Sequence, residues 1–344
     1  MLTSAPTRLS NELADVKTVV QWQHRLRETI HSPTAGAAPL TLDPASLSLL
    51  QDSSPNRVSW QQFDHCAAIT RIYALFEKAI SDLVGEYLSL MPRLCPDYCQ
   101  LNNDMRVHYR IGVGQILGKW SAAQPLYTHL TEEVIAAGLV DGLRKQPYSL
   151  LADAFLTDSD NYRVATLQKL FKRFGFDDAY ACVRDNTDIK DFCNRRLGSE
   201  TADSFLNEFV RTRNEAAHGA ASSIAGVGEI TNYADFVVLV VDALATLLRT
   251  RIVREGVDAG CSEHLATVLH AYSDNIVGIK ALSTATIAVG DNLFAGKKQI
   301  EPVTVISLQI VDAEHAAISL TPGVQIGVKL DKQIPAGSGL YRWI

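Results

Sequence analysis

The sequence predicts a mainly helical protein that ends in a small all-β domain. Over most of the first 275 residues, apolar side chains recur at spacings of three and four, which is the period of an amphipathic helix. After Asn275 the pattern changes to short β-branched segments separated by turns, such as the one at Pro322-Gly323. One chain therefore contains a helical part followed by a strand-rich part.

The composition is that of an ordinary globular protein. The 344 residues are 47% hydrophobic and 20% charged, enough for a substantial core and two or three domains. The formal net charge of -6 argues against a broad basic surface that coats nucleic acid, so any RNA contact should be local. The N-terminus lacks the apolar core of a signal peptide, and the most apolar run, Phe236–Leu248, is about 13 residues long, too short to cross a bilayer. We expect a cytoplasmic protein that does not enter the membrane.

The N-terminal region, residues 1–59, is predicted to be one helix and a connection. Residues 8–30 follow an approximate helical period, with Ser10 or Asn11 available as a cap. Residues 31–59 are rich in Pro, Ser, Thr and Ala, which favours a long surface connection over a packed element.

Residues 60–272 are predicted to form the helical domain. From Trp60 to Leu90 the apolar positions predict a long core helix that ends at Met91-Pro92. Further helices are predicted near 105–119, 130–139, 160–174, 187–197, 200–218, 231–254 and 260–272.

Residues 276–344 are predicted to be a separate all-β domain. Its turns are marked by Gly-Asp-Asn at 290–292 and Pro-Gly at 322–323. The expected strands are Ile276–Leu282, Thr284–Val289, Val303–Val311, Ala316–Leu320 and Val324–Leu330.

The segment R-N-E-A-A-H, from Arg213 to His218, combines the residue types needed for phosphate chemistry. At 3.6 residues per turn, Arg213 falls in the middle of the apolar arc of the helix 200–218, where a guanidinium must meet a carboxylate, a phosphate or a solvated interface. Asn214 and His218 are i, i+4 neighbours on a polar stripe beside it, and Gly219 suits the left-handed position after a helix. Arg213 and His218 are about 140° apart, so one helix does not aim both side chains at one point.

Two interpretations of this segment stay open. Arg213 could pair with a buried carboxylate and His218 could cap the helix, with no chemical role. Alternatively, the planar fork of Arg213 could hold two phosphate oxygens while His218 transfers protons. The misfit of Arg213 on an apolar face and the clustering of Arg211, Asn214 and His218 favour the second interpretation.

The string R-N-E-A-A-H followed by Gly resembles the R-N-x-x-x-H signature of HEPN domains. D-H-C-A-A-I-T-R-I-Y-A-L-F-E-K-A-I at 64–80 resembles the opening helix of the RiboL-PSP and MAE-type branches, and N-Y-R-V-A-T-L-Q-K-L-F-K-R-F-G at 161–175 resembles their middle helix. The resemblance spans roughly residues 60–255 and implies a metal-independent endoribonuclease that uses no cofactor. Such enzymes occur in toxin–antitoxin, abortive-infection and other antiviral systems.

Carried over residue by residue, the resemblance makes Arg213 and His218 catalytic and Asn214 an orienting or substrate-contacting neighbour. The implied products are a 2′,3′-cyclic phosphate and a 5′-hydroxyl. HEPN nucleases commonly act as dimers whose motif helices line one cleft, so we expect a homodimer formed through the motif helix. RNA is the expected substrate, and an antitoxin or defence-system protein is a candidate partner.

Residues outside the motif are also candidates for the site. Arg71, Lys172, Arg173 and Arg211 lie on predicted helices and are candidate RNA contacts, although an ordinary solvated surface charge is the alternative for each. In family terms a polar residue of the opening helix often faces the motif, so Glu77 is a candidate to pair with Arg213 and orient it.

The β-rich region resembles the second-domain barrel of translation elongation factors. The runs that carry the resemblance are G-D-N-L at 290–293, V-I-S-L-Q-I at 305–310, P-G-V-Q-I-G-V-K-L-D at 322–331 and I-P-A-G-S-G at 334–339. In the factors this barrel contacts tRNA or the ribosome, which implies a role in directing the chain to translational RNA or a translation factor. A barrel that only supports folding or dimer contacts is the alternative.

Other motifs do not support a metal or nucleotide site. Cys95 and Cys99 are close, but no second Cys or His pair lies at zinc spacing. G-D-N-L-F-A-G-K-K at 290–298 has five residues between its glycines where a phosphate loop needs four, and G-V-G-Q-I-L-G at 112–118 misses dinucleotide spacing. The alternatives to a ribonuclease are a noncatalytic HEPN module for dimerisation or RNA binding and a regulated partner subunit of a defence system.

Overall fold

The computed structural model describes residues 1–31, 43–119, 130–157, 161–198, 200–219, 223–310 and 313–344. The chain divides into two compact units. The motif unit comprises Thr3–Gly85 and Phe155–Leu244, and the barrel unit comprises Met1–Leu2, Glu86–Ala154 and Ala245–Ile344. The two longest helices, α3 and α11, each contribute residues to both units.

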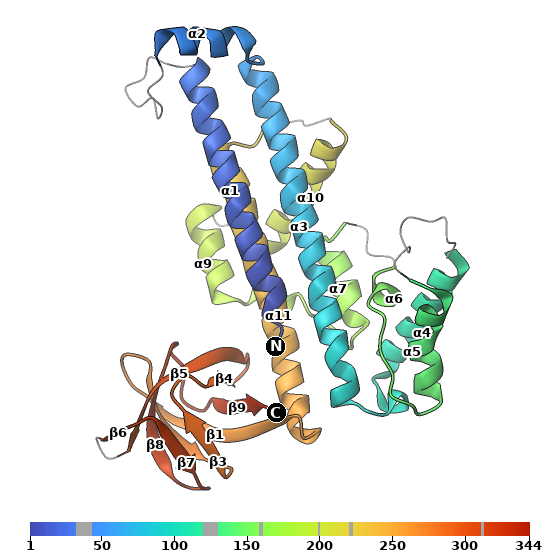
Figure 1. The fold of residues 1–344 in the computed structure, drawn as a ribbon, viewed down its shortest axis with the longest axis vertical. Helices are drawn as coiled ribbons and strands as arrows, with labels where there is room; N and C mark the ends of the chain where they lie inside the picture. The colour runs from blue at the N-terminus through green and yellow to red at the C-terminus, as the bar shows by residue number, and fades with distance from the viewer. Residues whose placement is uncertain (32–42, 120–129, 158–160, 199, 220–222, 311–312) are drawn as a thin grey trace. The chain divides into compact units, whose positions relative to one another are not determined.

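The motif unit is built from helices. In Figure 1, α1 and α3 run side by side, and ion pairs from Arg8 to Asp82 at 2.5 Å and from Arg27 to Asp64 show that they are antiparallel. The helices are α1 (Ser4–His31), α2 (Pro44–Ser53), α3 (Arg57–Leu94), α6 (Asp153–Leu156), α7 (Val164–Lys172), α8 (Ala181–Arg184), α9 (Thr187–Arg196), α10 (Ala202–Ala217) and α11 (Val227–Asp258).

The region expected to be a connection contains a helix. Residues 32–42 lie outside the described part of the chain, but α2 follows them and α3 already begins at Arg57. The Asp43 side chain accepts hydrogen bonds from the main-chain N–H groups of Ala45 and Ser46, and Pro44 occupies the first turn. An N-cap Asp before a first-turn proline is a helix start signal, so the prediction of a connection over the whole of 31–59 is wrong.

The core of the motif unit is rich in aromatic side chains from α3, α10 and α11. The ring centroids of Tyr73 and Phe209 are 5.8 Å apart, and those of Phe209 and Tyr233 are 5.0 Å apart. Phe205 stacks on Tyr233 at 4.9 Å. Because all four rings are buried, these contacts fix α10 against both long helices.

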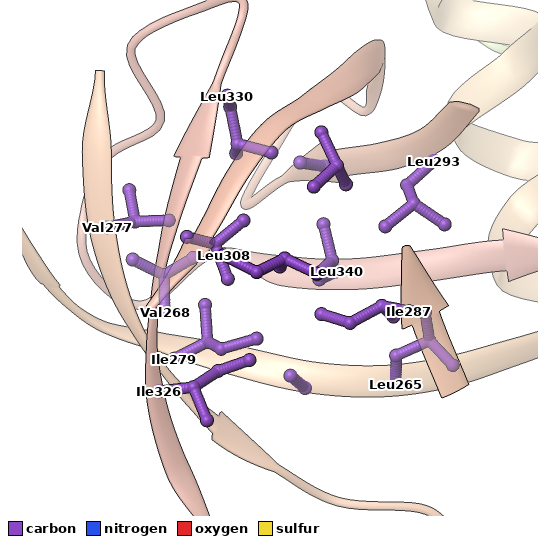
Figure 2. Packing of buried hydrophobic residues seen from close by; sticks show 14 of the residues in the cluster. Leu265, Val268, Val277, Ile279, Ile287, Leu293, Leu308, Ile326, Leu330 and Leu340 are labelled. Carbon is purple, nitrogen blue, oxygen red and sulfur yellow. The ribbon is translucent and has the colours of Figure 1, made fainter. Parts of the chain in front are cut away.

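In the barrel unit, six antiparallel strands form a closed barrel. Their order is β4-β9-β1-β2-β8-β5, and β4 also pairs with β5, which closes the ring. The strands are β1 (Ser262–Ala271), β2 (Ile276–Ala281), β3 (Ala285–Ala288), β4 (Asn292–Gly296), β5 (Glu301–Ile310), β6 (Ala313–His315), β7 (Ala317–Leu320), β8 (Gln325–Leu330) and β9 (Gly339–Trp343). Figure 2 shows the inward-facing Leu, Val and Ile side chains that fill the interior. The mainly α fold with a C-terminal barrel is thus confirmed.

The predicted helix over 260–272 is wrong, because β1 occupies Ser262–Ala271. The end of α11 explains the change: Gly260 has φ +70°, a conformation suited to glycine after a helix. Leu265, Ala266 and Val268 are buried in the barrel core. Their spacing in the sequence also suits one face of a helix. The β domain therefore starts at 262 instead of 276, and β4, β6 and β9 are strands that the sequence analysis did not predict.

Contacts within the barrel unit join the barrel to the ends of α3 and α11. The main-chain N–H of Ile300 donates to Thr250 Oγ1 at 2.8 Å, and Ser262 Oγ donates to the Val253 carbonyl at 2.7 Å. The guanidinium of Arg93 lies 5.2 Å from the centre of the Trp343 ring. The same unit holds α4 (Asn103–Lys119), the 3₁₀ helix η1 (Tyr98–Gln100) and α5 (Glu132–Leu143).

Candidate active site

The motif lies in the last turn of α10 and at its C-terminal cap. Thr201 caps the other end of the helix, because its hydroxyl accepts a hydrogen bond from the main-chain N–H of Ser204 at 3.2 Å. His218 is the C-terminal cap, and Gly219 follows with φ +66°, the left-handed conformation predicted for it. The helix therefore ends directly after the motif's histidine.

Arg213 is half-buried against α3. Its side chain is 26% exposed, and its guanidinium carbon is 4.1 Å from the centre of the buried Tyr73 ring. Glu77, one turn further along α3, has a carboxylate oxygen 3.9 Å from Arg213 Nη2. The expected contact between Glu77 and Arg213 is therefore present, and the aromatic face of Tyr73 provides a second favourable interaction for the cation.

Two amide oxygens bind the same guanidinium nitrogen. Arg213 Nη1 donates to Asn161 Oδ1 at 3.2 Å and to Asn214 Oδ1 at 2.9 Å. Asn161 precedes α7, and its neighbour Tyr162 donates its main-chain N–H to the Tyr73 hydroxyl at 2.8 Å. Segments distant in the sequence thus meet around one arginine.

The Tyr73 hydroxyl stays protonated in this environment. Burial raises its pKa above the ordinary tyrosine value, and the charge of Glu77 and a hydrogen bond with Glu77 raise it further. Tyr73 therefore offers Arg213 a neutral aromatic ring, and its hydroxyl contacts both Glu77 and the Tyr162 main chain.

His218 is in a different environment. Its side chain is exposed, and within the described residues it makes no hydrogen bond or ion pair. Its main-chain N–H donates to the Asn214 carbonyl at 3.1 Å, which is the last turn of the helix. In the part of the chain that the structure describes, no hydrogen bond joins the side chains of His218 and Arg213.

Comparison with known protein families agrees with this architecture. Residues 45–250, more than half of the chain, match the family model described as RiboL-PSP-HEPN. The chain belongs to the RiboL-PSP-HEPN family. The match covers the helices that carry Tyr73, Glu77, Asn161 and the motif, and it starts within α2, close to where the sequence resemblance was placed.

Comparisons with individual proteins add no functional argument for this HEPN chain. No curated protein matches it. The C-terminal domain of a putative U32 peptidase from Geobacillus thermoleovorans matches 23% of this chain and 99% of its own at 13% identity and a TM-score of 0.21. A flavohemoglobin from Malassezia yamatoensis matches 73% of this chain and 63% of its own at 12% identity and a TM-score of 0.13. The resemblance of the barrel to an elongation-factor domain stays a prediction.

The structure separates the candidate RNA contacts of the HEPN chain into two groups. Lys172 is exposed, and Arg71 is exposed with a 3.5 Å contact to Glu12. Arg211 is exposed, but its guanidinium is shared between Glu208 and Glu215 on the same helix. These three side chains are accessible, yet two already have acidic partners.

The structure corrects the prediction made for Arg173. Its residue is 5% exposed, and its guanidinium donates to the main-chain carbonyl of Phe155. A buried arginine in such a contact holds two parts of the fold together, so the prediction that Arg173 contacts RNA is wrong.

Tyr73 and Asn161 are site residues that were not predicted from the sequence. Tyr73 is indistinguishable in the sequence from the other apolar positions of α3. Asn161 has φ +54°, a left-handed conformation that asparagine tolerates better than most residues, and that is the only local signal for it. No described helix is long and apolar enough to span a membrane, and no group of three His, Cys, Asp or Glu residues in the described part could hold a metal ion.

Proposed function

We propose that this HEPN chain is a metal-independent endoribonuclease in which Arg213 binds the scissile phosphate and His218 transfers protons. The environment of Arg213 is the observation that carries the proposal. Among the described residues, the carboxylate paired with it is that of Glu77, which is 3.9 Å away and does not form a close bidentate pair. A quarter of the arginine side chain stays accessible, so a phosphate can reach a cation that is already ordered.

The proposed reaction needs no group beyond the substrate and these side chains. The ribose 2′-hydroxyl loses its proton and attacks the adjacent phosphorus, so an O2′–P bond forms while the P–O5′ bond breaks. Arg213 stabilises the charge that develops on the nonbridging oxygens, and His218 transfers a proton between the attacking and leaving oxygens. Asn214 holds Arg213 from the same helix. The products are a 2′,3′-cyclic phosphate and a 5′-hydroxyl.

The proposed active form is a homodimer. Within one chain Arg213 faces α3, whereas His218 is exposed at the end of α10 without a side-chain partner among the described residues. Two copies related by a two-fold axis can bring the arginine of one chain and the histidine of the other to one phosphate. Single-stranded or looped RNA is the proposed substrate, because its backbone adopts the required geometry most easily.

The biological role that we propose is that of a toxin or antiviral effector controlled by a partner protein. This follows from the family resemblance and from the proposed cleavage of RNA. Induced expression should stop cell growth, and His218→Ala should restore it. Growth arrest by both forms would separate toxicity from cleavage and contradict this role.

The test of the proposed activity uses the purified full-length chain, RNA and EDTA. We expect cleavage that leaves cyclic phosphate ends and falls by roughly 10²- to 10⁴-fold in His218→Ala and in Arg213→Ala. Arg195→Ala is a control, because its charge is exposed and lies next to Asp191. Cleavage that EDTA abolishes, or that both variants retain, would contradict the proposal.

A noncatalytic HEPN module is the second candidate function. The contacts of Arg213 with Tyr73, Asn161 and Glu77 also suit a structural arginine that stabilises the helical fold. In that case Arg213→Ala would lower stability, no RNA would be cut, and the dimer or RNA affinity would be the measurable property.

A further inference from the structure

We infer that Asn161 and Tyr73 are positioning residues that fix the guanidinium of Arg213 so that one of its edges faces the phosphate. This inference rests on the proposed ribonuclease activity.

The guanidinium nitrogen Nη1 has both of its hydrogens engaged. It donates to the amide oxygens of Asn161 and Asn214, at 3.2 and 2.9 Å. Nε is buried and has no hydrogen-bond partner among the described residues, and Nη2 is 3.9 Å from the Glu77 carboxylate. The Nη2 group is therefore the part of Arg213 with donors left for a phosphate oxygen.

Neutral oxygens suit a positioning role better than a carboxylate. An amide oxygen orients the guanidinium without cancelling its charge, as a close carboxylate would. The Tyr73 ring adds a flat surface 4.1 Å from the guanidinium carbon, which restricts movement out of its plane. Asn161 and Tyr73 thus define the direction and the plane of the same group.

The segment that carries Asn161 is itself held in place from two helices. Tyr162 donates its main-chain N–H to the Tyr73 hydroxyl of α3 at 2.8 Å. The main-chain N–H of Val164 points to Asn207 Oδ1 of α10 at 3.4 Å. Because Asn161 has φ +54°, glycine can replace it without changing the backbone. Asn161→Gly therefore removes the amide and leaves the segment intact.

The first experiment measures single-turnover cleavage of an oligoribonucleotide by the full-length protein. Asn161→Gly removes one acceptor of Nη1. Tyr73→Phe keeps the ring but removes the hydroxyl that holds the Tyr162 main chain, and with it the neighbouring Asn161. We expect each to lower the cleavage rate by about tenfold with little change in substrate affinity, because a misplaced group affects the transition state more than binding. The matched controls are Asp274→Gly, another left-handed position, and Tyr272→Phe, an exposed ring, and both should leave the rate unchanged.

A double-mutant cycle separates positioning from general support of the fold. In an Arg213→Lys background there is no guanidinium to orient, so Asn161→Gly should lower the residual rate by less than about twofold. An equal loss in both backgrounds would overturn the inference, because the asparagine would then act independently of Arg213. An unchanged rate in Asn161→Gly would also overturn it.

A readout that does not depend on activity separates this inference from the proposed function. Nitrogen NMR of the arginine side chains should show slow rotation of the Arg213 guanidinium in the wild type and faster rotation in Asn161→Gly. Wild-type protein that cleaves RNA but shows no such difference contradicts the positioning role alone. Protein that shows the difference but cuts no RNA contradicts the ribonuclease and retains Asn161 and Tyr73 as a structural clamp on Arg213.

Discussion

The two ends of the six-residue motif have opposite environments. Arg213 contacts Tyr73 and Glu77 from α3, Asn161 from the segment before α7, and its neighbour Asn214. His218, five positions later, is exposed at the end of α10. Among the described residues, one chain therefore supplies an ordered arginine, the proposed phosphate anchor, whereas the proposed proton-transfer group is not held by side-chain contacts. This difference is the physical basis for proposing that a second copy completes the site.

The largest expected effect is the loss of activity when His218, at the exposed end of the motif, is replaced. His218→Ala should lower the cleavage rate by roughly 10²- to 10⁴-fold, yet change the free energy of unfolding by less than about 0.5 kcal/mol, because an exposed side chain contributes little to stability. Cleavage kinetics together with denaturant unfolding check this. A large loss of stability would show that His218 has a packing role and would remove the contrast with Arg213.

At the Arg213 end of the motif, the expected effect is on the stability of the fold. Tyr73 is fully buried and contacts Phe209, so Tyr73→Ala should lower the free energy of unfolding by about 3–5 kcal/mol. The exposed Tyr272 is the matched control, and Tyr272→Ala should change stability by less than about 0.5 kcal/mol. Urea unfolding of both variants measures the difference, and similar values would argue against the packing described around Arg213.

A buried histidine that contacts the segment after the motif should make the stability of the protein depend on pH. His65 is buried, and its Nδ1 accepts a hydrogen bond from the main-chain N–H of Ala225 at 3.0 Å. Burial lowers the pKa of His65, and the charges of Glu229 and Glu215 oppose this shift. The unfolded chain therefore binds a proton more readily, and stability should fall as pH drops below about 6.5, by up to ~1.4 kcal/mol per pH unit for each such group.

The control for this pH dependence is His65→Asn, which retains an acceptor but does not titrate. It should reduce the slope of unfolding free energy against pH between pH 7 and 5. A part of the slope should remain, because burial also lowers the pKa of His264 in the barrel unit. An unchanged slope in His65→Asn would contradict the assignment.

The smallest expected effect is at the start of the motif helix. Thr201→Ala removes the N-cap of α10 and should lower the unfolding free energy by about 1 kcal/mol. The cleavage rate should stay within about twofold, since the cap lies at the opposite end of α10 from the motif. Thr201→Ser retains the hydroxyl and is the matched control for both measurements. A loss of activity as large as that of Asn161→Gly would show that any weakening of α10 disturbs the motif.

The sequence predicted the helices in which the apolar pattern continues over many residues, and it predicted the motif at the end of α10. It also predicted the contact between Glu77 and Arg213, although its orienting role stays a prediction. Asn161 escaped prediction because its contact spans 52 positions and depends on a single left-handed residue. Strand β1 was assigned to a helix because its buried residues, including Leu265 and Val268, fit either period. Arg173 shows the same limit, since a sequence does not reveal which surface of α7 is covered.

The most direct test of the central claim mixes two inactive variants. Arg213→Ala and His218→Ala are purified separately, combined in equal amounts, allowed to exchange subunits, and assayed for RNA cleavage in EDTA. If the arginine of one chain and the histidine of the other serve one phosphate, the mixture recovers about a quarter of wild-type activity, because half of the dimers then contain one intact site. Recovery cannot arise from misfolding of either variant. A mixture as inactive as its components, from a wild type that is active, would contradict the shared site.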